Sequence, residues 1–168
     1  MSYKPLQRAV PSTVLTRGGW LRGTFHVPEK SHLADALNRQ GAFQRITDVS
    51  MPGRFDSLAF LAVHRDAMYL VVPESTADED PPRNPYEQPE WQRVAFLLEG
   101  GVVEGSVATL KDVRVSDFFA NRSDFVVISD VILRFESPGQ ATVERRAPRA
   151  VINSGCVIGI ADLGLVEG

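Results

Sequence analysis

The feature that constrains the fold most is an internal repeat. Residues 18–50 are repeated without a gap at residues 100–132, at a constant offset of 82 positions. Several other pairs in the alignment are conservative exchanges. The residues of the first copy that are identical in the second are Gly18, Gly19, Gly23, Asp35, Phe43, Ile46, Asp48 and Val49. We interpret the chain as a tandem duplication, so its fold must be built from two similar units.

The repeat sets the domain organisation. Two units of about 75 residues each have thin cores, so we expect them to pack on each other or on partner chains. We predict an N-terminal arm at residues 1–11, a first repeat at 12–73, a second repeat at 91–163 and a tail at 164–168. Residues 74–90 are acidic and contain four prolines, which predicts a semi-extended linker.

Hydrophobic periodicity indicates the elements of each repeat. Residues 20–27 alternate in polarity, as in a half-buried strand, and place Gly23 on the inward face, where it allows a sharp bend. A helix is expected from a cap at Ser31, with Asp112 as the cap in the second copy. Strands at 43–51 and 125–135 follow, and then hairpins at 58–72 and 142–160. Aligning the hairpins at an offset of 88 pairs Met68 with Cys156.

Each repeat is therefore expected to run β-β-α-β-β-β. This predicts a mainly β chain made of two tandem small antiparallel β-barrels, with five strands and one short helix each.

A resemblance to Sm-like barrels is carried by a glycine turn, a Gly-x-x-x-Gly-x-Phe strand, a downstream Asp and Asn, and a closing hairpin. The residues that match are Gly19, Gly23, Phe25, Asp35, Asn38 and the turn at Arg65 and Asp66, with Gly101, Gly105, Val107 and Asp117 in the second copy. Unlike that family, this chain interrupts each unit with its helix after the second strand. The chain also resembles an uncharacterised bacterial group of small-barrel domains. The resemblance implies the barrel fold; we do not transfer the RNA site of Sm proteins.

Composition narrows the function classes. A hydrophobic fraction of 43% and a charged fraction of 23% are typical of a soluble globular protein. A net charge of −3 disfavours broad binding of phosphate backbones. No apolar run approaches the length of a membrane span, and the N-terminus does not resemble a signal peptide, so we expect a cytoplasmic protein.

No residue pattern predicts catalysis, a cofactor or a metal site. Asp35 and Asp48 recur in the second copy, which favours roles in the fold over a paired-carboxylate site. The histidines, His26, His32 and His64, fit no metal-binding spacing and are interpreted as surface residues. Cys156, the single cysteine, cannot form an internal disulfide and is expected to pack as a small hydrophobe in the last strand. We therefore expect no enzymatic activity.

A candidate interface lies on the outward face of the second strand of each repeat. Trp20 and Arg22 in the first repeat correspond to Val102 and Glu104 in the second. Opposite charges at equivalent positions attract if the two surfaces meet, and a tryptophan beside an arginine is a common interface anchor. The sequence thus favours a non-enzymatic interaction or assembly module that binds itself or another protein.

Two alternatives remain open. The first is an Sm-like nucleic-acid-binding protein, which requires an aromatic and basic patch to converge on one face: Arg17, Trp20, Arg22, Arg39 and Arg45. The second is a nucleotide or anion sensor that uses Arg145, Arg146 and Arg149. That cluster superficially resembles the cyclic-di-GMP signature of PilZ barrels, but its spacing differs, and solvated arginines on an edge strand explain it better.

Overall fold

The computed structural model describes residues 5–76, 79, 88–120, 122, 124–136 and 142–166. The first half of the chain contains β1 (Gln7–Thr16), β2 (Gly19–Pro28), α1 (Leu33–Arg39), β3 (Phe43–Met51), β4 (Phe55–His64), a 3-10 turn η1 (Arg65–Ala67) and β5 (Met68–Pro73). The second half contains β6 (Glu90–Leu98), β7 (Gly101–Thr109), α2 (Val115–Phe119), β8 (Phe125–Phe135), β9 (Val143–Asn153), a 3-10 turn η2 (Ser154–Cys156) and β10 (Gly159–Leu165). The predicted order β-β-α-β-β-β is confirmed in both halves.

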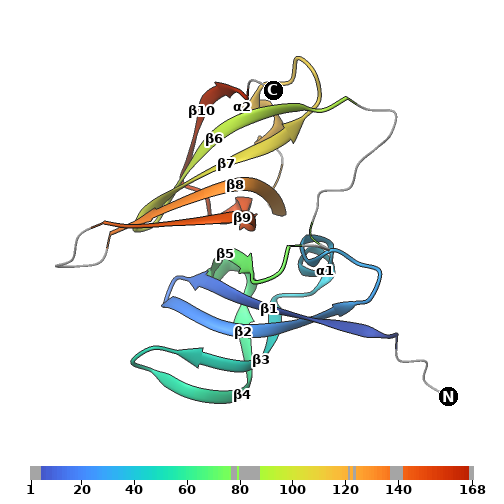
Figure 1. Cartoon of the computed structure of the whole chain (residues 1–168), viewed down its shortest axis with the longest axis vertical. Coiled ribbons are helices and arrows are strands. Elements are labelled where there is room, and N and C mark those ends of the chain that lie inside the picture. The colour runs from blue at the N-terminus through green and yellow to red at the C-terminus, as the bar shows by residue number, and fades with distance from the viewer. Residues whose placement is uncertain are drawn as a thin grey trace.

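The described strands join into one ten-stranded antiparallel sheet in the order β10-β6-β7-β8-β9-β5-β1-β2-β3-β4 (Figure 1). The mainly β prediction is confirmed. The sequence predicted two barrels, whereas here β5 of the first half pairs with β9 of the second, and the sheet does not close on itself. We call this β5–β9 pairing, with the contacts around it, the seam. Within the described residues, no helix is long and apolar enough to cross a membrane.

The register of the strands gives the correspondence between the halves. Phe43 pairs with His64 and Phe125 pairs with Asn153. Counterparts are thus 82 residues apart in the third strand (125 − 43) and 89 apart in the fourth (153 − 64). The predicted hairpin offset of 88 is wrong by one: it aligns Ala62 with Ala150 and Val63 with Val151, and the register of the strands does not keep these chance identities. Cys156 therefore corresponds to Ala67, and it ends η2 before the last strand begins.

Several helices and strands begin or end at other residues than predicted. β1 already begins at Gln7, so residues 7–11, expected in a loose arm, pair with β2. The helices begin after His32 and Arg114, whose backbones occupy the N-cap positions, and neither Ser31 nor Asp112 does so. β10 continues to Leu165, into the expected tail. Most of the expected linker, and residues 137–139 of the predicted insertion, lie outside the described residues.

The repeated glycines allow two strands to cross closely, as predicted. A Cβ atom on Gly23 would lie 2.3 Å from Cγ2 of Ile46, and one on Gly105 would lie 3.0 Å from Cβ of Ile128. The register shifts beside both glycines. On the facing strands, Asp48 and Asp130 adopt left-handed φ angles of 51° and 50°, a conformation that aspartate tolerates better than most residues. These repeated aspartates therefore serve the backbone geometry.

The described residues form two hydrophobic clusters, and each extends across the seam. Neighbouring residues of a strand point to opposite faces. As a result, the pair Leu70 and Ile152 contributes to the cluster of the second half, and the pair Val71 and Val151 to that of the first. All four are buried. The two halves thus share side chains at the seam, which explains how two thin cores become sufficient.

Candidate interaction surfaces

Trp20 joins the two halves. This β2 residue packs edge-on against Phe135 of β8, with 5.8 Å between ring centroids. The guanidinium of Arg145, on β9, lies 5.5 Å from the centroid of the Trp20 ring. Both partners belong to the second half, so the predicted aromatic anchor acts between repeats within one chain.

The other predicted interface residues have contacts of their own in the structure. Arg22 pairs with Glu74 of its own half at 2.7 Å, and both side chains are exposed. Val102 lies opposite Arg134 in the β7–β8 ladder. Glu104 contacts arginines of the second half, so within one chain Arg22 and Glu104 have separate partners.

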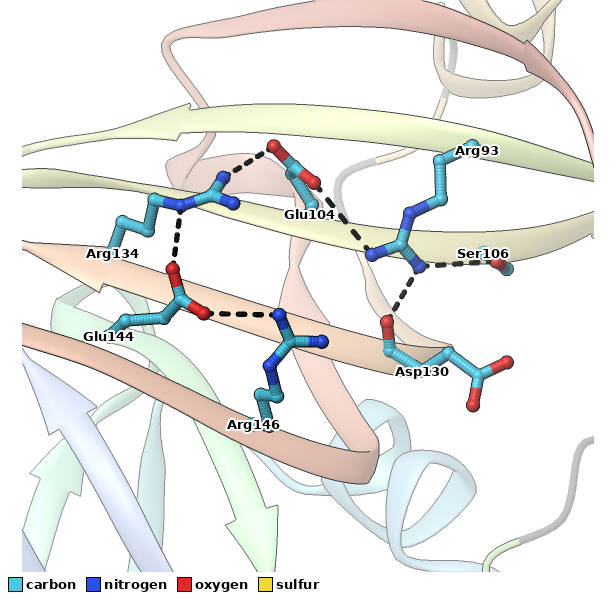
Figure 2. A network of polar contacts seen from close by, with 7 residues as sticks. All are labelled: Arg93, Glu104, Ser106, Asp130, Arg134, Glu144 and Arg146. Atoms are coloured by element: carbon cyan, nitrogen blue, oxygen red, sulfur yellow. Dashed lines mark hydrogen bonds and ion pairs between the residues drawn. The ribbon is translucent and has the colours of Figure 1, made fainter.

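Glu104 belongs to a ladder of alternating charges across β6, β7, β8 and β9 (Figure 2). Its carboxylate lies 2.5 Å from Nη1 of Arg134 and 3.8 Å from Nη2 of Arg93. Arg134 also contacts Glu144, which in turn contacts Arg146, both at 3.2 Å. Hydrogen bonding to Glu104 raises the pKa of Arg134 above its ordinary value. Each arginine in the ladder has a carboxylate partner, so two of the three positive charges are compensated locally.

The seam contains polar contacts that sequence reasoning missed. The Asn38 side chain accepts a hydrogen bond from the Phe125 N–H at 2.7 Å and donates one to the Phe125 carbonyl at 3.0 Å. The amide of α1 thus satisfies the backbone at the start of β8, as a neighbouring strand would. On the other side, the Asn153 amide donates to the carbonyls of Arg65 and Met68 at 3.1 and 3.0 Å. No spacing rule connects such distant residues, so only the fold identifies these contacts.

The arginine cluster on β9 does not converge. Arg145 lies over Trp20, Arg146 pairs with Glu144, and Nη1 of Arg149 donates to the Pro148 carbonyl. Alternation along the strand also directs Arg146 to the face opposite Arg145 and Arg149.

The residues of the predicted nucleic-acid patch come from several elements. Arg17 donates to the Asp66 carbonyl at 3.4 Å, and a hydrogen bond with Tyr69 raises the pKa of Arg17. Arg39 contacts Ser31 at 3.5 Å, and Arg45 lies on β3 opposite Ala62. Together with Trp20 and Arg22, these side chains come from the β1–β2 hairpin, α1 and β3.

The histidines and the cysteine occupy structural positions. His26 hydrogen-bonds Thr47 at 2.8 Å, and the His64 side chain accepts the Asp66 N–H at the start of η1. In the part of the chain that the structure describes, no three potential ligands gather into a metal site. Cys156 is half-buried, with its sulfur 3.2 Å from the Asp66 carbonyl, and burial raises the pKa of its thiol.

The two outer edges of the sheet carry most of the exposed large hydrophobic side chains. Among the described strands, β4 and β10 each have a hydrogen-bonded neighbour on one side only, and they lie at opposite ends of the long axis (Figure 1). Of the twelve exposed large hydrophobic residues in the described part of the chain, three lie on β3 and β4 and five on or beside β10. They are Phe43, Phe55 and Phe60, and Ile158, Ile160, Leu163, Leu165 and Val166. We call these two surfaces the β4 edge and the β10 edge.

Comparison with known protein families, with curated proteins and with solved structures finds no match to this chain.

Proposed function

We propose that this chain is a non-enzymatic, cytoplasmic assembly module that binds protein partners through the β4 edge and the β10 edge. A strand at the edge of a sheet presents unpaired N–H and C=O groups and is a template for another strand. Proteins commonly protect such edges with charges or prolines. Here both edges carry several exposed hydrophobic residues beside a single acidic residue each, Asp56 on β4 and Asp162 on β10, and this apolar exposure carries the proposal.

The internal repeat also supports a protein partner at the β10 edge. Tyr69 and Val71 of β5 are 6% and 0% exposed, whereas their counterparts Ile158 and Ile160 are 66% and 38% exposed. The same positions are therefore apolar in both copies, but only one copy is covered within the chain. An apolar surface of this kind favours a protein partner over a nucleic-acid backbone, which binds cationic surfaces.

We also infer that each half is a small barrel-type unit, related to its neighbour by the duplication. The order of strands within each half supports this inference: the fifth strand lies beside the first, followed by the second, third and fourth. The crossings at Gly23 and Gly105 add a similar bend to both halves.

Native mass spectrometry of the protein purified from its own host tests the proposal, with the ratio of absorbance at 260 and 280 nm read on the same sample. We expect a complex, either with copies of the chain or with another protein, that is lost when Phe60 on β4 and Ile160 on β10 are both replaced by lysine. The matched control is a double lysine variant at Ser57 and Asp162, two exposed polar positions on the same strands. A monomer, or a complex that survives the edge variant, contradicts the proposal. Co-purified nucleic acid would favour the alternative instead.

A further inference from the structure

The seam is a template for a second contact that the chain cannot make with itself. In the seam, the fifth strand of one half, β5, pairs with the fourth strand of the other, β9. The two strands at the ends of the sheet are the fourth strand of the first half, β4, and the fifth strand of the second half, β10. Each outer edge is therefore the counterpart of a strand that is already paired within the chain.

On the β4 edge, the two counterpart positions are apolar, and one of them is exposed. Val151 and Ile152 of β9 are buried in the seam, and they correspond to Ala62 and Val63 of β4. Ala62 is exposed, and Val63 is covered from its own half, where it joins the first cluster. At the start of the adjacent strand, Phe125 is 2% exposed beneath the seam contacts, whereas its counterpart Phe43 is 57% exposed.

We propose that the β10 edge of one copy pairs with the β4 edge of a second copy, repeating the seam between chains. This inference rests on the proposed assembly function and names its partner. The seam pairs Leu70 with Ile152 and Val71 with Val151. Shifting each position by 89 predicts that Gly159 of one copy pairs with Val63 of the other, and Ile160 with Ala62.

The alternation of side chains in the seam also predicts which hydrophobic cluster each side chain enters in the contact between copies. Val71 and Val151 both enter the cluster of the half that supplies the fifth strand. By the same geometry, Ile160 and the Ala62 of the second copy would enter the cluster of the second half of the first copy. Phe43 of the second copy would come to lie against the same half, as Phe125 lies against the first half within the chain.

The arrangement of the edges makes this association head-to-tail. β4 and β10 lie at opposite ends of the molecule (Figure 1). Each copy thus keeps one edge available after the other is paired, and the contact repeats until a ring closes or an open chain grows. Native masses should therefore be multiples of the 18.5 kDa chain.

The contact between chains should be weaker than the seam. Two polar residues that stabilise the seam, Asn38 and Asn153, have Ala120 and His64 as counterparts, so the contact between copies cannot reproduce their hydrogen bonds in the same form. The seam also benefits from covalent connection, which raises the effective concentration of its strands. We therefore expect association that depends on concentration.

Disulfide cross-linking of the purified chain tests the register. The variant Ala62→Cys/Ile160→Cys is prepared in a Cys156→Ser background, so that it contains only the two introduced thiols. Directly opposed residues of antiparallel strands lie about 4.5–5.5 Å apart between Cα atoms, within the range of a disulfide. We expect covalent dimers and larger multiples under oxidising conditions. The matched control is Ser57→Cys/Ile160→Cys, because Ser57 lies on the same strand, five positions from Ala62, and should cross-link at least tenfold less.

Native mass measured across protein concentration completes the test, with Ile160→Lys as the disrupting variant and near-UV circular dichroism to verify its fold. Concentration-dependent multiples that this variant removes, together with preferential cross-linking of the Ala62/Ile160 pair, support the inference. Equal cross-linking of both cysteine pairs overturns it. A purified protein that is monomeric at every concentration also overturns the inference. In that case, the proposed function still stands if the protein forms a complex with another host protein and the Phe60 and Ile160 lysine variant loses that complex.

Discussion

Phe43 and Phe125 occupy the same position in the two halves, yet Phe125 is 2% exposed and Phe43 is 57% exposed. The difference comes from the seam: Phe125 begins β8 beneath Asn38, with the Arg65 guanidinium 5.1 Å from its ring centroid. Phe43, on β3 beside the outer edge, makes an edge-on contact with His64. One sequence position thus serves two environments, because the duplication places one copy at a covered surface and the other at an exposed one.

Replacing these two phenylalanines by alanine should lower the free energy of unfolding by very different amounts. Phe125→Ala removes a buried aromatic ring and is expected to lower the free energy of unfolding by about 3–5 kcal/mol. Phe43→Ala removes an exposed ring and should change it by less than about 0.5 kcal/mol in protein dilute enough to be monomeric. Urea denaturation measures both. Similar losses in the two variants would contradict the burial described here.

Gly23 should not tolerate a side chain. A Cβ at this position would lie 2.3 Å from Cγ2 of Ile46 and 3.3 Å from the Thr47 carbonyl oxygen, so either the β2–β3 crossing or Ile46 must shift. We expect Gly23→Ala to lower the midpoint of urea unfolding, with a loss of about 1–3 kcal/mol. Gly41→Ala is the control, because a Cβ there meets nothing within 4 Å. Equal stability of the two variants would show that the crossing is looser than described.

The sequence predicted those features whose cause is local or repeated. Alternation of polarity identified β2, and the duplication singled out Gly23 and Gly105 because both halves need the same crossing. The repeated Asp48 and Asp130 were correctly assigned to the fold, although their left-handed backbone could not be inferred from the sequence alone. A second copy therefore helped to separate structural residues from specialised ones.

The seam could not be predicted, because it depends on pairing between distant strands. Val71 and Val151 are ordinary apolar residues of strands, and no pattern in the sequence indicates that they face each other. For the same reason the contact of Trp20 with Phe135 of the other half was not foreseen, although the sequence had singled out Trp20 as an anchor. The surfaces with opposite charges at Arg22 and Glu104 were inferred without knowledge of Glu74 and Arg134, with which they pair.

Glu79 should contribute strongly to the stability of the first half. It falls within the expected spacer, yet it is 1% exposed, accepts the Leu33 N–H at the start of α1 at 2.6 Å and contacts Arg8 at 2.5 Å. Glu79→Ala leaves that guanidinium and N–H without their carboxylate, so we expect a loss of about 3 kcal/mol or more in urea denaturation. Glu74→Ala, which breaks the exposed pair with Arg22, should cost at most about 1 kcal/mol. A neutral Glu79→Ala would argue against this capping role.

Trp20 and Arg22 should have separable effects. Because Trp20 packs on the second half, Trp20→Ala is expected to lower the free energy of unfolding by about 1–3 kcal/mol. Arg22→Glu places a like charge near Glu74 and should cost less than about 1 kcal/mol. Native mass adds a second readout: edge pairing predicts that Arg22→Glu leaves the oligomer unchanged, whereas a contact with Glu104 of another copy predicts its loss.

Cys156 should react slowly with alkylating reagents. Burial, followed by the nearby Asp66 carboxylate, raises the pKa of the thiol above its ordinary value, and the thiolate is the reactive form. At neutral pH the folded protein should therefore be alkylated by iodoacetamide more slowly than the urea-unfolded chain. Its rate should keep rising with pH beyond the point where the unfolded chain levels off, because the folded thiol ionises at higher pH. Equal rates at neutral pH would mean that the sulfur is more accessible than its position beside the Asp66 and Met68 carbonyls implies.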